Sequence, residues 1–324
     1  MGFCILKLKI ALIAALLAAV VTLAWWELRH GPPQMLANAP SISKPAPSIV
    51  TAGEAERSAT ANEFRWSDVA TLTQRLGNGV ERATDLATVY DQYSGSTDSL
   101  TRNIAYRAWS ACFPAFLGAE GRPVTVEQFA AAMPATAANM PLRLAAYREL
   151  LNRCQRFFYM SRDEIVHASQ RQEDAWKRGE ILAPGELAMK HFLEGRSDEA
   201  LDVARRTVQS GDGYAVASLQ EYMHRMIAQK METQQLPGSE RSDLRGLAVA
   251  MAACQLGLDC SADSLTALLL CANGGQCAGN LTDRYLQALP NAADRERAGR
   301  LADLTLAAIR TNDFVSLGLD KTAQ

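Results

Sequence analysis

The sequence contains no catalytic or ligand-binding motif that stands above background. Its 324 residues include no H-E-x-x-H, G-x-S-x-G, phosphate-binding P-loop or dinucleotide-binding glycine pattern, and they include only four histidines. No C-x-x-C pair occurs, which disfavours a redox-active dithiol. The sequence therefore predicts no catalytic residue, no cofactor and no metal ion.

An excess of charge of one sign is also missing. The 33 basic and 35 acidic residues leave a net charge of −2, and no long run of either sign occurs. This balance disfavours nucleic acid as a partner. Aromatic residues make up only 7% of the chain, and alanine and leucine crowd segments without proline or glycine, which favours helices over strands. We expect an all-α protein, either an irregular helical bundle or a short α-solenoid of helical hairpins.

One long apolar run lies near the N-terminus. It covers 17 uncharged residues, 10–26, and follows Lys7 and Lys9. The apolar part of a cleaved signal peptide is shorter, about 7 to 15 residues. The only A-x-A pattern nearby, residues 37–39, lies well past the run and is followed by a proline. We therefore expect residues 1–30 to be an uncleaved signal anchor that forms a transmembrane helix, and a cleaved signal peptide is the alternative.

The charges around this run predict its orientation. The two lysines and the free amine should stay in the cytoplasm, which places the remainder of the chain outside. We therefore expect a single-pass protein of a bacterial inner membrane with the bulk of the chain in the periplasm. If the segment is cleaved, the protein is instead soluble in the periplasm.

Composition divides the rest of the chain. Residues 31–62 are rich in proline, alanine and serine, which is typical of a disordered tether. Helical patterning then predicts a helical domain over residues 63–236 and a cysteine-rich helical subdomain over residues 237–324. Capping boxes mark helix starts at Thr125 and Ser161. Breaks between helices are expected at 77–79, 94–96, 118–123, 179–185, 211–213 and 236–239.

The pattern C-x-x-G-x-x-C occurs twice in the C-terminal part. The first copy runs from Cys254 through Gly257 to Cys260, and the second covers residues 271–277 with Gly274 at the same place. Each copy is typical of a helix end, where glycine adopts the left-handed turn and a disulfide joins the two cysteines. Disulfides imply an oxidising compartment, in agreement with export.

Six cysteines follow the apolar run, and they allow fifteen connectivities. We favour the local pairs Cys254–Cys260 and Cys271–Cys277, which leaves Cys112–Cys154 as a bridge between helices. The alternative is a zinc site formed by the four C-terminal thiolates. Structural zinc usually requires two to four residues between paired cysteines, whereas both gaps here contain five, so disulfides are preferred.

A few polar pairs have spacings that occur in catalytic or metal sites. Glu221 and His224 share a helix face, as in some carboxylate metal sites, although a solvated hydrogen bond is the common outcome. The adjacent acids at 163–164 and 173–174 could act in glycoside hydrolysis, but such acids usually serve the helix dipole and solubility.

One segment carries a family resemblance. Residues 192–204 have the aromatic, glycine, Glu-Ala-Leu and alanine spacing found where two repeat helices meet, and residues 211–215 match the turn into a following helix. On these grounds the stretch 186–223 resembles one helical hairpin of tetratricopeptide or Sel1-type repeat proteins. The alternative is a generic helical hairpin inside an irregular bundle, since no second unit occurs at the same period.

Anchor, tether, disulfides and hairpin together predict a membrane-tethered periplasmic helical protein that acts in binding or scaffolding. The expected partner is another envelope protein, contact with the membrane is made through the N-terminal helix, and no nucleic acid is involved. The alternative is a hydrolase of cell-envelope polymer that uses carboxylates on a helical scaffold.

Overall fold

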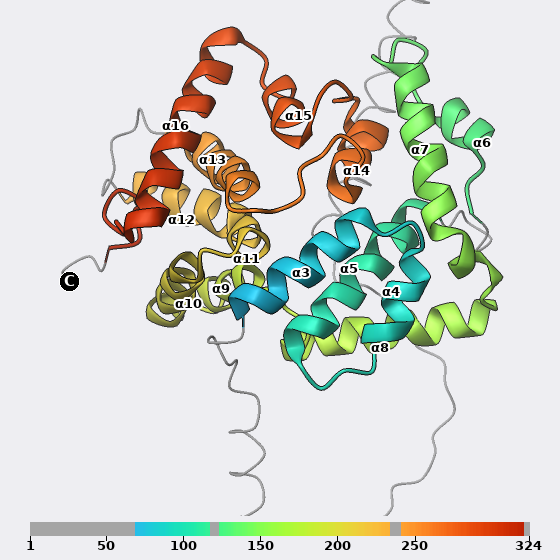
Figure 1. Ribbon diagram of the computed structural model, residues 1–324, viewed down its shortest axis with the longest axis horizontal. Helices are drawn as coiled ribbons and strands as arrows, with labels where there is room; N and C mark the ends of the chain where they lie inside the picture. Colours follow the sequence, from blue (N-terminus) through green and yellow to red (C-terminus); the bar gives the residue numbers. More distant parts are fainter. Residues whose placement is uncertain (1–68, 117–122, 234–240, 321–324) are drawn as a thin grey trace, which may run out of the picture. The chain divides into compact units, whose positions relative to one another are not determined.

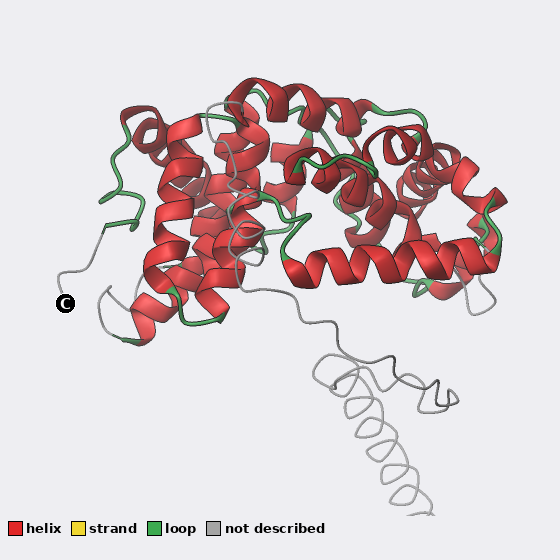
Figure 2. Ribbon diagram, turned by 90° about the horizontal axis from the view of Figure 1, so that it is seen from below, coloured by secondary structure: helices red, strands yellow, loops and turns green. Residues whose placement is uncertain are grey.

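The computed structural model describes residues 69–116, 123–233 and 241–320 (Figure 1). Within these ranges all regular structure is helical, as Figure 2 shows, so the prediction of an all-α fold is confirmed. The expected anchor and tether, residues 1–62, lie outside the described residues. None of the described helices combines the length and the apolar character that a membrane span requires.

The N-terminal half of the described chain forms helices that pack both on one another and on helices of the second half. In chain order they are α3 (Val69–Arg82), α4 (Leu86–Tyr93), α5 (Ser99–Phe116), α6 (Val126–Ala132), α7 (Met140–Cys154), the 3-10 helix η2 (Gln155–Tyr159) and α8 (Arg162–Arg178). Helix α4 lies against α5, and α6 lies against α7.

The second half contains eight further helices. They are α9 (Pro184–Leu193), α10 (Ser197–Ser210), α11 (Gly213–Ser218), α12 (Gln220–Glu232), α13 (Ser242–Gln255), α14 (Leu265–Gly274), α15 (Leu281–Gln287) and α16 (Ala292–Thr311). Sequence neighbours again pair, α9 with α10 and α12 with α13, but α13 also packs along α16, and α14 packs along the distant α7. Helices α12 and α13 flank the expected boundary at residue 236, and the subdivision there stays a prediction.

Local signals set several helix starts. The hydroxyls of Thr125 and Ser161 accept from the backbone N–H three residues on, and the side chains of Gln128 and Glu164 return the bond, so both capping boxes are confirmed.

The expected break at residues 77–79 is wrong, because α3 continues through it to Arg82. A Cβ atom on Gly77 would lie 2.6 Å from ring carbons of Tyr214. Glycine is therefore present here to let α11 approach the middle of α3, and its usual association with turns misled the sequence argument.

The segment with a repeat-like sequence forms a helical hairpin. Helix α9 ends at a turn in which Gly195 has a φ of +76°, and α10 returns along α9. Ala200 and Ala204 are fully buried, which fits the close approach of the two helices. The relation to tetratricopeptide or Sel1-type families stays a prediction.

Three cysteine pairs lie at disulfide distance. The Sγ atoms are 2.00 Å apart in Cys112–Cys154 and 2.03 Å apart in both Cys254–Cys260 and Cys271–Cys277. These are the pairs that spacing favoured. The four C-terminal sulfur atoms form two disulfides and are not arranged as a zinc site.

The glycine that turns the chain differs between the two short loops. Gly257 has a φ of +99°, as expected for the first copy. In the second copy Gly274 is the last residue of α14, and the left-handed residue is Gly275, with a φ of +80°. The left-handed glycine of the second copy thus lies one position later than the shared pattern predicts.

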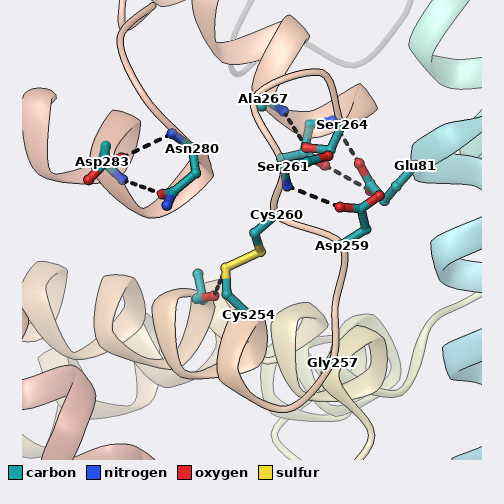
Figure 3. Close-up of a disulfide and its surroundings, with 12 residues drawn as sticks. Glu81, Cys254, Gly257, Asp259, Cys260, Ser261, Ser264, Ala267, Asn280 and Asp283 are labelled. Carbon is teal, nitrogen blue, oxygen red and sulfur yellow. Dashed lines mark hydrogen bonds between the residues drawn. A yellow bond between two sulfur atoms is a disulfide. The ribbon is translucent and has the colours of Figure 1, made fainter.

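The first loop is docked onto α3. The side chain of Asn78 donates to Gly257 O (2.8 Å) and accepts from Asp259 N (2.7 Å), while Arg82 pairs with the carboxylate of Asp259. Figure 3 shows the Cys254–Cys260 disulfide with Asp259 turned toward Ser261 and with Glu81 of α3 nearby.

The second loop is docked onto α7 by the same pair of residue types. Asn139 donates through Nδ2 to Gly275 O (2.7 Å), and Arg143 donates to Ala272 O and Asn273 O, both at 2.9 Å. At each loop, an asparagine and an arginine four residues apart on an N-terminal helix or its cap bind groups of the loop. These groups are carbonyl oxygens or a carboxylate at the end of a C-terminal helix. The disulfides therefore hold loops that bind the N-terminal helices.

Candidate ligand-binding site

Two adjoining cavities share walls from α9, α11 and α12. Helices α5, α14 and α15 complete the wall of the polar cavity, and α8 contributes to the wall of the apolar one. The polar pocket has a volume of about 520 Å³, and its wall includes Asn103, Tyr106, Arg107, Glu186, Tyr214 and Tyr285. The apolar pocket has a volume of about 550 Å³, and its wall includes Trp176, Met189, Lys190 and Leu193. Both volumes lie in the range of small-ligand sites.

The two pockets share three wall residues, Glu186, Ser218 and Glu221. This common wall forms where α9 begins against the end of α11. Gly185 N donates to Ser218 Oγ (2.8 Å), and a Cβ atom on Gly185 would lie only 2.0 Å from Ser218 O. The close approach requires glycine, and it brings a polar and an apolar cavity next to each other.

Asn103 organises the floor of the polar pocket. Its Nδ2 donates to Ile181 O (2.7 Å) and to Glu186 Oε2 (3.2 Å), and its Oδ1 accepts from the Tyr214 hydroxyl (2.9 Å). Asn103 is buried, so its amide is fixed by these three bonds. It joins the start of α9, the middle of α5 and the start of α11.

Among the carboxyl groups in the walls of the two pockets, Glu186 has a raised pKa. Burial raises its pKa by more than the hydrogen bond from Ala183 N, the charge of Arg107 and the hydrogen bond from Asn103 lower it. The bonds from Ala183 N (2.7 Å) and Asn103 both end on Oε2. Within the described ranges Oε1 receives no hydrogen bond, while the side chain lines both pockets.

The positive charge of Arg107 is compensated by a buried carboxylate of α3. Its guanidinium pairs with Glu81, a fully buried carboxylate that also accepts from Thr266 N (2.8 Å) and Thr266 Oγ1 (2.9 Å). Burial alone would lower the pKa of Arg107, but Glu81 overcomes this effect and raises it. The Arg107 side chain also lies over the ring of Tyr214, with Cζ 5.3 Å from the centroid.

The acids that the sequence suggested as a catalytic pair serve α8 instead. Glu164 accepts from Ser161 N (2.7 Å) in the capping box, and Glu173 pairs with Lys177 (2.6 Å) one turn along the helix. The wall residues of the two pockets include neither acid. Glu164 thus lies in the first turn of α8, where a carboxylate favours the helix dipole, and Glu173 is held in an ion pair on the same helix.

Of the pair Glu221 and His224, only Glu221 lines the two pockets. Glu221 does lie in the common wall, but its carboxylate accepts from Arg225 Nε (2.7 Å). His224 Nδ1 is buried and has no hydrogen-bond partner among the residues described. Over the same ranges no cluster of three or more histidine, cysteine, aspartate or glutamate side chains has the arrangement of a metal site.

Sequence reasoning missed Asn103, Arg107 and Glu186. Asn103 and Arg107 lie four residues apart on α5, whereas Glu186 belongs to α9, so no spacing in the sequence connects the carboxylate with the other two. One signal was available for Glu186, because it stands at the third position of a Pro-first helix start that has Ala183 where a capping hydroxyl is usual. Comparison of the chain with protein-family models, with curated proteins and with solved structures finds no match.

Proposed function

We propose that this chain is a membrane-tethered periplasmic protein whose helical part binds a segment of another envelope protein in the two adjoining pockets. The observation that carries the proposal is the common wall of Glu186, Ser218 and Glu221. A segment in this site would meet apolar surface on one side and fixed polar groups on the other. Both kinds of contact are usual where a binding site combines affinity with specificity.

Exposed apolar surface supports binding over a purely structural role. Trp176 is 48% exposed and Leu193 is 68% exposed, and both line the apolar pocket. Tryptophan is enriched among the residues that anchor protein partners. Without a partner, these side chains expose apolar area to water, and a bound partner would bury that area.

A discrete cross-link would test the binding proposal. A benzoylphenylalanine at position 193 of the full chain, expressed in its native host, is expected to form one main adduct with an envelope protein, identified by mass spectrometry. Trp176→Ala should reduce the yield about tenfold, because it removes the other exposed wall of the pocket. Benzoylphenylalanine at Val315, which is also exposed but lies outside both pockets, is the control.

Two outcomes would count against the proposal. The pockets would not be the binding site if benzoylphenylalanine at position 315 gave the same adduct. The same conclusion would follow if Trp176→Ala left the yield of the adduct from position 193 unchanged. If instead the protein releases soluble fragments from purified envelope glycan and Glu186→Gln stops this release, the hydrolase alternative is favoured. The raised pKa of Glu186 is the observation on which that alternative rests, because a general acid requires it.

The compartment has its own test. Three disulfides favour an oxidising space, and the N-terminal sequence favours a retained anchor. Protein purified from the native membrane should show six blocked cysteines by intact mass after alkylation, and six more alkylated ones after reduction, with the N-terminus present. Free thiols at these six positions before reduction would overturn the periplasmic assignment.

A further inference from the structure

Most charged side chains around the two pockets already have a partner of opposite charge. Ion pairs join them to neighbours inside the chain: Arg107 to Glu81, Lys177 to Glu173, Glu194 to Arg196, and Glu221 to Arg225. A ligand charge directed at any of these groups would have to compete with an existing pair. They are therefore poor determinants of ligand charge.

Glu186 is different, because its contacts are with neutral donors. Ala183 N and Asn103 Nδ2 occupy Oε2, and Arg107, which acts on Glu186 through space, is bonded to Glu81. Lys190, one turn further along α9, donates its ammonium to Lys177 O (3.1 Å). The pocket thus contains one carboxylate with a free oxygen and no ion pair among the described residues.

We infer that the bound segment of the partner carries a lysine whose ammonium group reaches Glu186 Oε1. The inference rests on the proposed function and specifies the ligand of the same site. A cation supplies the partner of opposite charge that the Glu186 carboxylate lacks, because Arg107 in the same wall is bonded to Glu81. Apolar residues beside the lysine would occupy the pocket of Trp176 and Leu193.

The geometry of Glu186 favours lysine over arginine. A guanidinium group binds a carboxylate best through two parallel hydrogen bonds, which require both oxygens. Here Oε2 is used by Ala183 N and Asn103, so one oxygen remains. An ammonium group acts as a point charge and needs only that oxygen. The length of a lysine side chain also lets the peptide backbone stay at the mouth of the pocket.

The test uses the full chain in lipid nanodiscs with 5-fluorotryptophan in place of its five tryptophans. The fluorine resonance of Trp176, assigned with Trp176→Phe, reports binding at the site itself. The probes are acetyl-Leu-Lys-Leu-amide, the same peptide with norleucine or arginine in the centre, and hexylamine. The lysine peptide should bind about tenfold more tightly than the norleucine peptide, the size expected for one charge-assisted hydrogen bond.

Glu186→Gln should abolish this preference, so that the lysine and norleucine peptides bind the variant with equal affinity. Glutamine keeps an oxygen that can accept from Ala183 N and Asn103, so the start of α9 is retained while the charge is lost. Glu194→Gln is the matched control. It also removes one carboxylate from the wall, but that carboxylate is already paired with Arg196, so the preference for lysine should survive.

The outcomes separate this inference from the proposed function. Equal binding of the lysine and norleucine peptides, or a preference that survives Glu186→Gln, would overturn the inference while the site remains a binding site. Arginine bound as well as lysine would refute the single-oxygen argument. Hexylamine bound as tightly as the lysine peptide would mean that the ligand is a free amine. If no probe binds and position 193 gives no adduct, the inference and the proposed function fail together.

Discussion

Replacing Cys112 and Cys154 with alanine should lower the free energy of unfolding by about 4 kcal/mol, on the loop-entropy estimate for a closed loop of this length. The two residues are 42 positions apart and join α5 to the end of α7. Both are buried, so the truncation also removes packing. The loss is a large part of the stability of an ordinary domain. Urea unfolding of the full chain, followed by circular dichroism, would measure it.

The matched control is the pair Cys254 and Cys260, which are only six positions apart. The same estimate gives about 2 kcal/mol for a loop of that size. We therefore expect the first double variant to lose about twice as much stability as the second. Equal losses would mean that loop closure does not determine the contribution, and that the contacts of the Gly257 loop with α3 matter as much as the length of the closed chain.

Packing around the Cys112–Cys154 disulfide also indicates that its loss should lower the free energy of unfolding more than loss of a short disulfide. Tyr90, Trp109 and Phe157 form an aromatic cluster with centroid distances of 5.2 to 5.7 Å. Trp109 precedes Cys112 by one helical turn, and Phe157 follows Cys154 by three residues. Loss of the disulfide would let α5 and η2 move apart and weaken this cluster, whereas the short disulfides lie at helix ends.

The features that the sequence predicted well are those encoded within a few residues. The capping boxes at Thr125 and Ser161 depend on residues three positions apart, and the local cysteine pairs depend on six. Even here local patterns had limits. Gly77 serves the contact with Tyr214 and does not end a helix, and that purpose is visible only when α11 is placed against α3.

The candidate site could not be predicted because its chemistry is made by distant residues. Nothing in the sequence near Glu186 shows that Asn103 will fix its Oε2 or that its side chain will line two pockets. Asn103 itself lies in the middle of a helix, where asparagine has low propensity and is normally exposed. A buried asparagine there has to be explained by tertiary partners, which the sequence does not reveal.

Glu81→Ala is expected to destabilise the protein by about 3 kcal/mol, the lower end of the cost of breaking a buried ion pair, because the partner Arg107 is only partly buried. Glu81 is 0% exposed, and its carboxylate accepts from Arg107, Thr266 N and Thr266 Oγ1. It thereby connects α3, α5 and the start of α14. After the substitution the guanidinium of Arg107 has no carboxylate partner and keeps its bond to Thr266 Oγ1, while the backbone N–H of Thr266 loses its acceptor. Thermal and urea unfolding would both report the loss.

A double variant separates the charge from the helix connection. In Glu81→Leu with Arg107→Met both charges are replaced by apolar side chains, and such replacements of buried pairs are often neutral or stabilising. If the unpaired charge causes the loss in Glu81→Ala, the double variant should recover most of the stability. If it is as unstable as the single variant, the bonds from Glu81 to Thr266 hold α14 in place, and the ion pair contributes little. Since Arg107 is 34% exposed toward the polar pocket, solvent screens part of its charge, so we expect recovery to be large but incomplete.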